Sequence, residues 1–187
     1  MKTFSAAAAA ALLTAVLLPG TASAAEPAHL AYTSAKFEKY SAKAKAVTYN
    51  AELVKAGAHV TVLSIPTIDG KTTVGIRVKG LVANRVYGTH VHVKKCGALP
   101  ADAGPHYQNV ADPVQPSVDP KYANPQNEIW LDLTTDERGN AYTTATVAWQ
   151  FTERHAQSVV LHAEKTSSHE GHAGTAGARL ACANVDF

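Results

Sequence analysis

The stretch Thr89-His90-Val91-His92-Val93 has the residue pattern of a β-strand. Side chains along a strand point alternately to its two faces, so both imidazoles face one way and the valines face the other. This stretch ends a run, residues 85–93, that is rich in β-branched residues. Seven further runs of similar composition lie on either side of it, at 46–54, 59–65, 72–79, 128–134, 140–151, 158–164 and 179–187. The sequence therefore predicts about eight strands.

Turn-forming sequences separate these runs, among them Asp69-Gly70 and Arg138-Gly139-Asn140. Beyond the N-terminal segment, no helical periodicity extends over more than about ten residues. We expect an all-β fold, a Greek-key barrel or sandwich of antiparallel strands with long loops. The connection 94–127 contains six prolines, and connections of this length are usually functional or disordered.

The overall composition is that of a globular domain with little net charge. The chain has 187 residues, 46% of them hydrophobic, with 17 Lys+Arg against 15 Asp+Glu and a formal net charge of +2. This length is sufficient for one domain with a core. Because the basic residues are scattered and form no stripe, we expect no nucleic-acid partner.

The N-terminus has the features of a secretory signal peptide. Lys2 precedes an apolar run, residues 6–18, and the small residues Ala22-Ser23-Ala24 follow. The run is shorter than the roughly 18 residues of a membrane span, which argues against the alternative of a membrane anchor. We predict a signal peptide at 1–24, a flexible leader at 25–45 and a domain at 46–187, in a secreted protein without a membrane span after cleavage. In that oxidising environment Cys96 and Cys182 are disulfide candidates.

Histidine is unusually frequent, with nine in the chain. His90 and His92 by themselves favour two polar residues on a solvated sheet face over a metal site. His106 lies in the proline-rich connection, and His162 ends an apolar strand, where a buried, hydrogen-bonded histidine is the simpler interpretation. Each histidine alone is therefore weak support for a metal site.

Taken together, four segments of this chain resemble the copper/zinc superoxide dismutase family. They occur in the order of the family: His90-Val91-His92 followed by Cys96, then 103–107, 159–162, and the glycine-rich stretch 174–182 that contains Arg179 and Cys182. The resemblance extends from about Ala46 to the C-terminus. It implies that copper is bound by four histidines, His90, His92, His106 and His162. It also implies that Cys96 is joined to Cys182 and that Arg179 guides an anion to the metal.

The sequence departs from the family where zinc is bound. No histidine occurs from Tyr107 to Leu131, and Thr166 stands where the family has an aspartate that links the two metal sites. Asp132 matches the zinc aspartate by its neighbours, but one carboxylate cannot complete a tetrahedral site. The chain therefore resembles the copper-only, secreted bacterial branch, and we expect no zinc at this site.

A metal-bound imidazole usually donates its second ring nitrogen to an acceptor, which zinc replaces in the usual site. Glu128 and Asp132 are four residues apart on a predicted strand, so both side chains lie on one face. We hypothesise that one of them, with Glu128 favoured, accepts a hydrogen bond from His106 or another copper histidine. The alternative is that both are exposed on a solvated face.

The remaining histidines, His29, His59 and His155, are expected to be exposed. His169 and His172 lie on a loop before the glycine-rich segment, either solvated or forming a replacement metal site. The predicted function is a copper-dependent superoxide dismutase that converts superoxide to dioxygen and hydrogen peroxide, with His106 carrying a proton. The alternative is a noncatalytic extracellular copper-binding module. The sequence makes no prediction of the oligomeric state.

Overall fold

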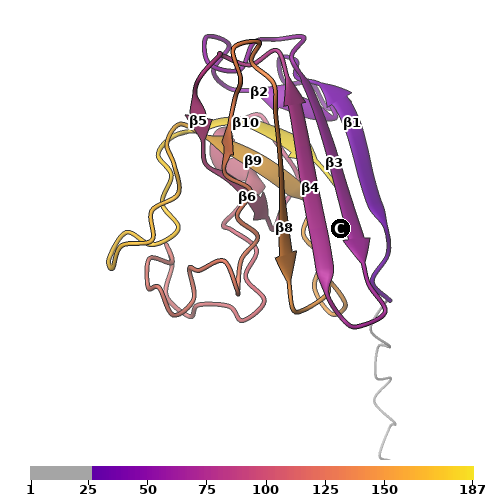
Figure 1. Cartoon of the computed structure of the whole chain (residues 1–187), viewed down its shortest axis with the longest axis vertical. Coiled ribbons are helices and arrows are strands. Elements are labelled where there is room, and N and C mark those ends of the chain that lie inside the picture. Colours follow the sequence, from indigo (N-terminus) through magenta and orange to yellow (C-terminus); the bar gives the residue numbers. More distant parts are fainter. Residues whose placement is uncertain (1–26) are drawn as a thin grey trace, which may run out of the picture.

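The computed structural model describes residues 27–187, in which ten strands form antiparallel sheets (Figure 1). The first sheet has the order β1-β3-β4-β8, with strands β1 (Ala31–Lys36), β3 (His59–Pro66), β4 (Thr72–Lys79) and β8 (Ala141–Val147). The second has the order β2-β10-β9-β6, with strands β2 (Ala46–Thr48), β10 (Arg179–Asn184), β9 (Ser158–His162) and β6 (Thr89–His92). A small third sheet pairs β5 (Val86–Tyr87) with β7 (Leu133–Thr134). The predicted all-β antiparallel fold is confirmed.

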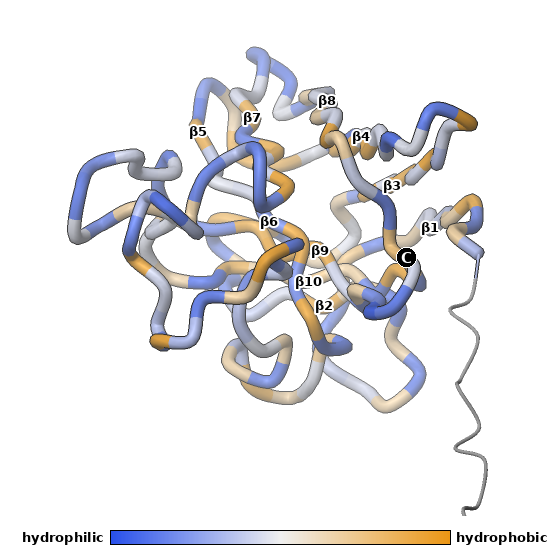
Figure 2. Tube along the Cα trace, turned by 90° about the horizontal axis from the view of Figure 1, so that it is seen from below, coloured by the Kyte–Doolittle hydropathy of each residue, from blue (hydrophilic) through white to orange (hydrophobic). Residues whose placement is uncertain are grey.

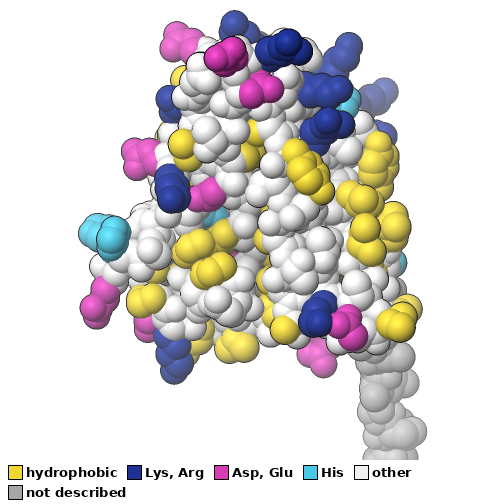
Figure 3. Space-filling model, viewed as in Figure 1, with side chains coloured by type: hydrophobic (Ala, Val, Ile, Leu, Met, Phe, Trp, Pro, Cys, Tyr) yellow, Lys and Arg dark blue, Asp and Glu magenta, His cyan; other side chains and the backbone are white. Residues whose placement is uncertain are grey.

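The core lies between the two larger sheets. In the first sheet, burial alternates along each strand, so that Val74, Ile76 and Val78 of β4 are buried while Arg77 faces out. Its outer face is open to solvent, and Tyr32 of β1 and Tyr142 of β8 are both exposed. Figure 3 shows hydrophobic side chains on the surface of this part of the molecule. This alternation is the pattern of an antiparallel sheet with one wet face.

The second sheet is covered on both faces. Every residue of β6 and β9 is buried, and Figure 2 shows hydrophobic segments gathered around these strands with hydrophilic ones mostly in the peripheral loops. Val91 and Val159 pack in the core between the sheets, whereas Val160 belongs to a second cluster that includes Cys182. The opposite face is covered by long loops, 93–132 and 163–178, which project from the same side of the molecule (Figure 1). The histidines of β6 and β9 lie beneath these loops.

One predicted boundary is wrong. Residues 31–36, within the expected flexible leader, form β1 and pair in antiparallel register with β3, from Ala31 opposite Ser64 to Lys36 opposite His59. The alternation of this strand is weak in the sequence because its inward side chains are small or polar, and its order comes from backbone hydrogen bonds to β3. The predicted signal peptide, 1–24, lies outside the described residues. No helix within 27–187 has the length and apolar character needed to cross a bilayer.

Several predicted strands are shorter than expected. The run 46–54 stays extended only to Thr48, after which the side chain of Asn50 accepts hydrogen bonds from the amides of Glu52 and Leu53 and turns the chain. The run 85–93 is divided at Gly88, where a Cβ atom would lie 2.4 Å from the carbonyl oxygen of Glu164. Glycine at this position allows the loop after β9 to approach the start of β6.

A disulfide joins Cys96, in the segment after β6, to Cys182 on β10, across 86 residues of sequence. This is the pairing that the family resemblance implies. The segment is held further by a hydrogen bond from the amide of Cys96 to the side chain of Asn184. Disulfides of this kind are typical of proteins in oxidising compartments.

Candidate metal centre

Four histidines converge on one point above the outer face of the second sheet. His90 and His92 come from β6, His162 from the end of the adjacent β9, and His106 from the loop that follows β6. One ring nitrogen of each lies within 4.8 Å of the corresponding nitrogens of the others. Within residues 27–187, this is the one group of three or more His, Cys, Asp or Glu side chains that could hold a metal ion.

Local backbone pairing explains why the loop histidine reaches the strand histidines. The amide of Tyr107 donates to the carbonyl of Val91 at 2.8 Å, and the amide of Val93 donates to the carbonyl of Pro105 at 3.2 Å. His106, between these contacts, therefore lies beside His92, with ring centroids 4.8 Å apart. The proline-rich connection thus adds a short stretch of pairing to the edge of β6.

Two of the imidazoles are oriented by backbone carbonyls. Nδ1 of His92 donates to the carbonyl of Gly104 at 2.9 Å, and Nδ1 of His162 donates to the carbonyl of Gly177 at 3.3 Å. Their Nε2 atoms then face each other at 3.4 Å. In each ring, one nitrogen is fixed by the protein and the other faces the centre, as a metal-binding histidine requires.

His106 is oriented by a buried carboxylate. Its Nδ1 donates to Oε2 of Glu128 at 2.8 Å, and the Glu128 side chain is only 1% exposed. Glu128 also accepts hydrogen bonds from Nε2 of Gln108 at 2.8 Å and from Nε1 of Trp130 at 2.7 Å. Three donors therefore compensate the burial of one carboxylate, which would otherwise be costly.

His90 is oriented through a hydroxyl group. Its Nε2 lies 2.7 Å from Oγ1 of Thr166, and that hydroxyl makes a short hydrogen bond to Oδ1 of Asp132. Asp132 thus contacts no histidine directly, whereas Glu128 contacts His106. Nδ1 of His90 is buried and has no hydrogen-bond partner in the part of the chain that the structure describes. A buried polar atom without a partner needs an explanation, and a bound metal ion is one.

The surroundings of His90, His92 and His162 favour the neutral form of these three imidazoles. Burial lowers the pKa of His90 and of His92 well below 6.5, and the neighbouring His106 lowers both further. Burial, and to a smaller extent the neighbouring His106, lowers the pKa of His162 to about 3. Neutral imidazoles have a free lone pair for a metal ion near neutral pH.

The donor set fits copper. Imidazole nitrogen suits copper among the transition metals, and sites built from several such nitrogens can hold both of its common oxidation states. The unpartnered Nδ1 of His90 and the inward Nε2 atoms of His92 and His162 are the lone pairs that such an ion requires. The residues present therefore fit a single copper ion.

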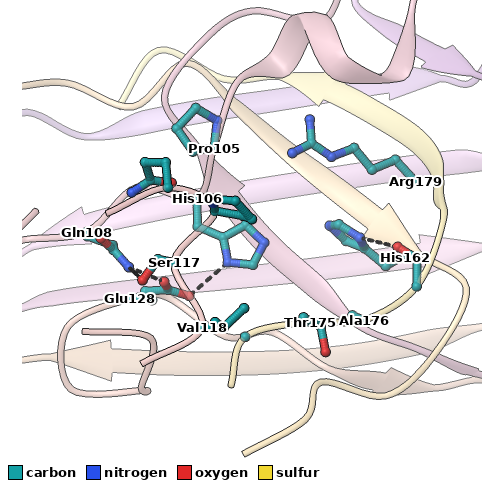
Figure 4. Close-up of a pocket in the computed structure, with 14 residues that line it drawn as sticks. Pro105, His106, Gln108, Ser117, Val118, Glu128, His162, Thr175, Ala176 and Arg179 are labelled. Atoms are coloured by element: carbon teal, nitrogen blue, oxygen red, sulfur yellow. Dashed lines mark hydrogen bonds and ion pairs between the residues drawn. The ribbon is translucent and has the colours of Figure 1, made fainter. Parts of the chain in front are cut away.

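A cavity of about 390 Å³ is lined by two of the four histidines, His106 and His162. Figure 4 shows His162 and Arg179 on one side of it and His106, Gln108 and Glu128 on the other. Arg179 extends from β10, and its Nη1 donates to the carbonyl of Pro100 at 3.0 Å. Burial lowers the pKa of Arg179, but a guanidinium stays charged near neutral pH. The cavity therefore presents a positive charge next to the histidine cluster.

The other histidines lie outside the cluster. His29 and His155 contact the carbonyls of Asp186 and Phe187, and His59 contacts the side chain of Ser34. His169 and His172 are exposed on the loop 163–178. These two are not part of any group of three metal-ligating side chains within residues 27–187.

Sequence reasoning did not identify Gln108 and Trp130 as partners of Glu128. Neither residue type signals such a role, because both occur widely in packing positions. The position of Thr166 did indicate a role. The family that the chain resembles has a carboxylate there, so a hydrogen-bond acceptor next to a histidine could be expected at this position. The contact of Thr166 with His90 shows which histidine that is.

The copper/zinc superoxide dismutase (SODC) family profile matches residues 56–185. A solved structure titled "Crystal Structure Analysis of the clock protein EA4" is 17% identical, with a TM-score of 0.53, covering 85% of this chain and 94% of that chain. At this identity the likeness concerns the fold alone. None of the curated proteins matches the chain.

Proposed function

Since the chain belongs to the copper/zinc superoxide dismutase family, we propose that it is a secreted, copper-dependent enzyme that converts superoxide to dioxygen and hydrogen peroxide. The observation that carries the proposal is the convergence of four imidazoles, two of which, His106 and His162, line a cavity that Arg179 also lines. A protein that only stored copper would need neither the cavity nor the guanidinium.

The ligand atoms follow from the hydrogen bonds. His92, His106 and His162 would bind copper through Nε2, because their Nδ1 atoms are engaged elsewhere. His90 would bind through its unpartnered Nδ1. Bound copper would supply one-electron exchange, so that two superoxide ions and two protons give one dioxygen and one hydrogen peroxide.

Arg179 attracts and positions the substrate. Superoxide is a small anion, and a fixed guanidinium in a cavity raises its local concentration and offers it hydrogen bonds. The bond from Nη1 of Arg179 to the carbonyl of Pro100 uses one donor and leaves others for the anion. That carbonyl lies in the short 3-10 helix Pro100–Ala103, which follows the disulfide-linked Cys96. The side chain is thus oriented by a tethered segment.

His106 is the residue best placed to handle a proton. Its Nδ1 stays on Glu128, so Nε2, which faces the cluster at the cavity, is the atom that would take up a proton when it is not bound to copper and would give that proton up on binding copper again. A ring held at one nitrogen returns to the same position after each proton transfer.

We propose that the site works with copper alone. In the zinc-containing members that the chain resembles, zinc occupies the second nitrogen of the corresponding histidine. Here Glu128 occupies that position on His106, and Gln108 and Trp130 hold the carboxylate in place. The hydrogen-bonded carboxylate performs the orienting task without a second metal.

Metal analysis and superoxide consumption test the proposal together. Protein loaded with copper and zinc should retain about one copper per chain and no zinc, and it should remove superoxide faster than buffer with the same free copper. Replacing His162 with Gln should reduce copper retention, and replacing the exposed His172 with Gln should not. Tight copper binding without superoxide consumption would contradict the enzymatic proposal and select a noncatalytic copper-binding module.

The role of Arg179 has its own test. Replacing it with Gln should lower the second-order rate of superoxide consumption about tenfold or more at low ionic strength, and weaken the dependence of the rate on salt. Arg138, exposed in a turn, is the matched control, and its replacement with Gln should change neither. Equal rates for both variants would exclude steering by Arg179.

The first residue of the recovered protein tests whether the signal peptide is removed during secretion. Protein recovered from the medium of an expressing bacterium should begin at Ala25, because cleavage is predicted after Ala22-Ser23-Ala24. An intact Met1 on cell-associated protein would contradict this part of the proposal.

A further inference from the structure

A chain of hydrogen bonds links Asp132 to His90 through Thr166. Oγ1 of Thr166 lies 2.7 Å from Nε2 of His90 and makes a short hydrogen bond with Oδ1 of Asp132. His90 is fully buried, and Thr166 is 9% exposed. These residues lie on different segments: the ring on β6, the hydroxyl on the loop after β9, and the carboxylate just before β7.

The direction of this chain follows from the groups themselves. A carboxylate only accepts hydrogen bonds, and a threonine hydroxyl has a single proton. Thr166 must therefore donate to Asp132, and it can only accept from His90. The proton of the neutral His90 ring then resides on Nε2, and the lone pair is on Nδ1, the atom without a partner within residues 27–187.

We propose that Asp132 and Thr166 are positioning residues that set the tautomer of His90 and so present its Nδ1 to the metal. This inference rests on the proposed copper site. Asp132 does not act as a metal ligand. It acts on His90 through the Thr166 hydroxyl, by fixing which way that hydroxyl points.

Two backbone amides hold the Asp132 carboxylate that accepts from this hydroxyl. The backbone amide of Thr166 donates to Oδ2 of Asp132 at 2.9 Å, and the amide of Thr89 donates to Oδ1 at 3.3 Å. The carboxylate thus ties the loop after β9 to the first residue of β6. At Gly88 an added Cβ would lie 3.2 Å from Oγ1 of Thr166, so the glycine allows this close approach.

The effect is confined to one ring. His92 and His162 are oriented by backbone carbonyls and His106 by Glu128, none of which involves Asp132 or Thr166. A change at Thr166 should therefore alter His90 and leave the tautomers of the other rings unchanged.

The first measurement uses metal-free protein. Long-range ¹H–¹⁵N correlation spectra report which nitrogen of each imidazole carries the proton. We expect Nε2–H for His90 in the wild type and in Thr166→Ser, and a mixture with Nδ1–H in Thr166→Val. The matched control is Thr89→Val, which removes a buried hydroxyl that has no hydrogen-bond partner among residues 27–187. This substitution keeps the backbone amide of residue 89 that donates to Asp132, so it should leave His90 as in the wild type.

The second measurement is copper(II) affinity by competition with a chelator. Thr166→Val should bind copper about 10–100-fold more weakly than the wild type, which is the usual effect of removing the hydrogen-bond partner of a metal-binding histidine. Thr166→Ser and Thr89→Val should bind copper as tightly as the wild type. If Asp132 acts through Thr166, the double variant Thr166→Val/Asp132→Asn should bind no more weakly than Thr166→Val alone.

These measurements need no superoxide. A His90 ring protonated on Nδ1 in the wild type, or a Thr166→Val variant that equals Thr89→Val in both tautomer and copper affinity, would overturn the inference. A copper-binding wild type with the expected tautomer but no superoxide consumption would support the inference and contradict only the catalytic proposal.

Discussion

Nδ1 of His106 lies 2.8 Å from Oε2 of Glu128, a carboxylate with only 1% of its side chain exposed. This carboxylate also accepts from Gln108 and Trp130, so three side chains donate hydrogen bonds to it. These three donors match a carboxylate, whose two oxygens both accept hydrogen bonds. They do not match a side-chain amide, whose nitrogen can only donate.

Replacing Glu128 with Gln should weaken copper binding about 10–100-fold, because an amide cannot satisfy all three donors and His106 loses its orientation. The unmet buried hydrogen bonds should also lower the free energy of unfolding by about 1–3 kcal/mol. Chelator competition and urea denaturation measure the two effects. Glu137→Gln, an exposed carboxylate, is the control. Two variants that behave alike would exclude a role for the Glu128 contact.

The metal-free protein should lose stability as the pH falls below about 6.5. Burial lowers the pKa of His90, His92 and His162, the last to about 3, whereas in the unfolded chain they titrate near 6.5. Between these two pKa values the unfolded chain binds more protons than the folded protein. Each ring therefore lowers the free energy of unfolding by up to about 1.4 kcal/mol for each unit by which the pH falls. Above about pH 6.5 these rings are neutral in both states, and the free energy of unfolding is not reduced by them.

Urea denaturation of the metal-free protein between about pH 7.5 and pH 4.5 measures this slope. A His162→Gln variant should have a slope smaller by about one proton, since it lacks one of the buried rings. An identical slope in both proteins would mean that His162 is not held neutral by the fold.

Replacing Gly174 with Ala should crowd the loop that packs against His106 and Glu128. Its backbone has φ +78°, and an added Cβ would lie 3.2 Å from the Cβ of Ala123 and 3.7 Å from both Nδ1 of His106 and Oε2 of Glu128. Gly171 has a similar φ of +75°, but nothing lies within 4 Å of the added atom. Both variants should lose about 1–2 kcal/mol from backbone strain. Only Gly174→Ala should also weaken copper binding, and equal copper affinities would contradict this.

Removal of the disulfide should affect stability and substrate attraction together. Replacing Cys96 and Cys182 with Ser opens a loop closed across 86 residues, which should cost about 2–5 kcal/mol of unfolding free energy. It also frees the segment whose Pro100 carbonyl orients Arg179. We expect the second-order rate of superoxide consumption to fall while copper content is retained. An unchanged rate in the folded variant would show that Arg179 is oriented without the cross-link.

The strands that were predictable have alternating β-branched residues on one buried face. The run 72–79 is β4 with the predicted bounds, because Val74, Ile76 and Val78 repeat at two-residue spacing. The strand β1 was not predictable in this way, since Ala31, Thr33 and Ala35 are too small or polar to mark a buried face. Its order depends on pairing with a strand that is distant in sequence.

The site was partly predictable. The spacing of His90 and His92 placed two rings on one face, but only the family resemblance joined them to His106 and His162. The choice between Glu128 and Asp132 depended on how the loop 93–132 folds back on β6, which periodicity does not reveal. Glu128 contacts His106, and Asp132 reaches His90 only through Thr166.

The second ring nitrogens of the four histidines are each held by an acceptor, at Gly104, Glu128, Thr166 and Gly177. Such a frame has little freedom to relax around one oxidation state in preference to another. A copper ion bound there would meet rings whose orientations the protein already fixes, and of the four only His106 would also exchange a proton, which favours a small reorganisation energy for electron exchange.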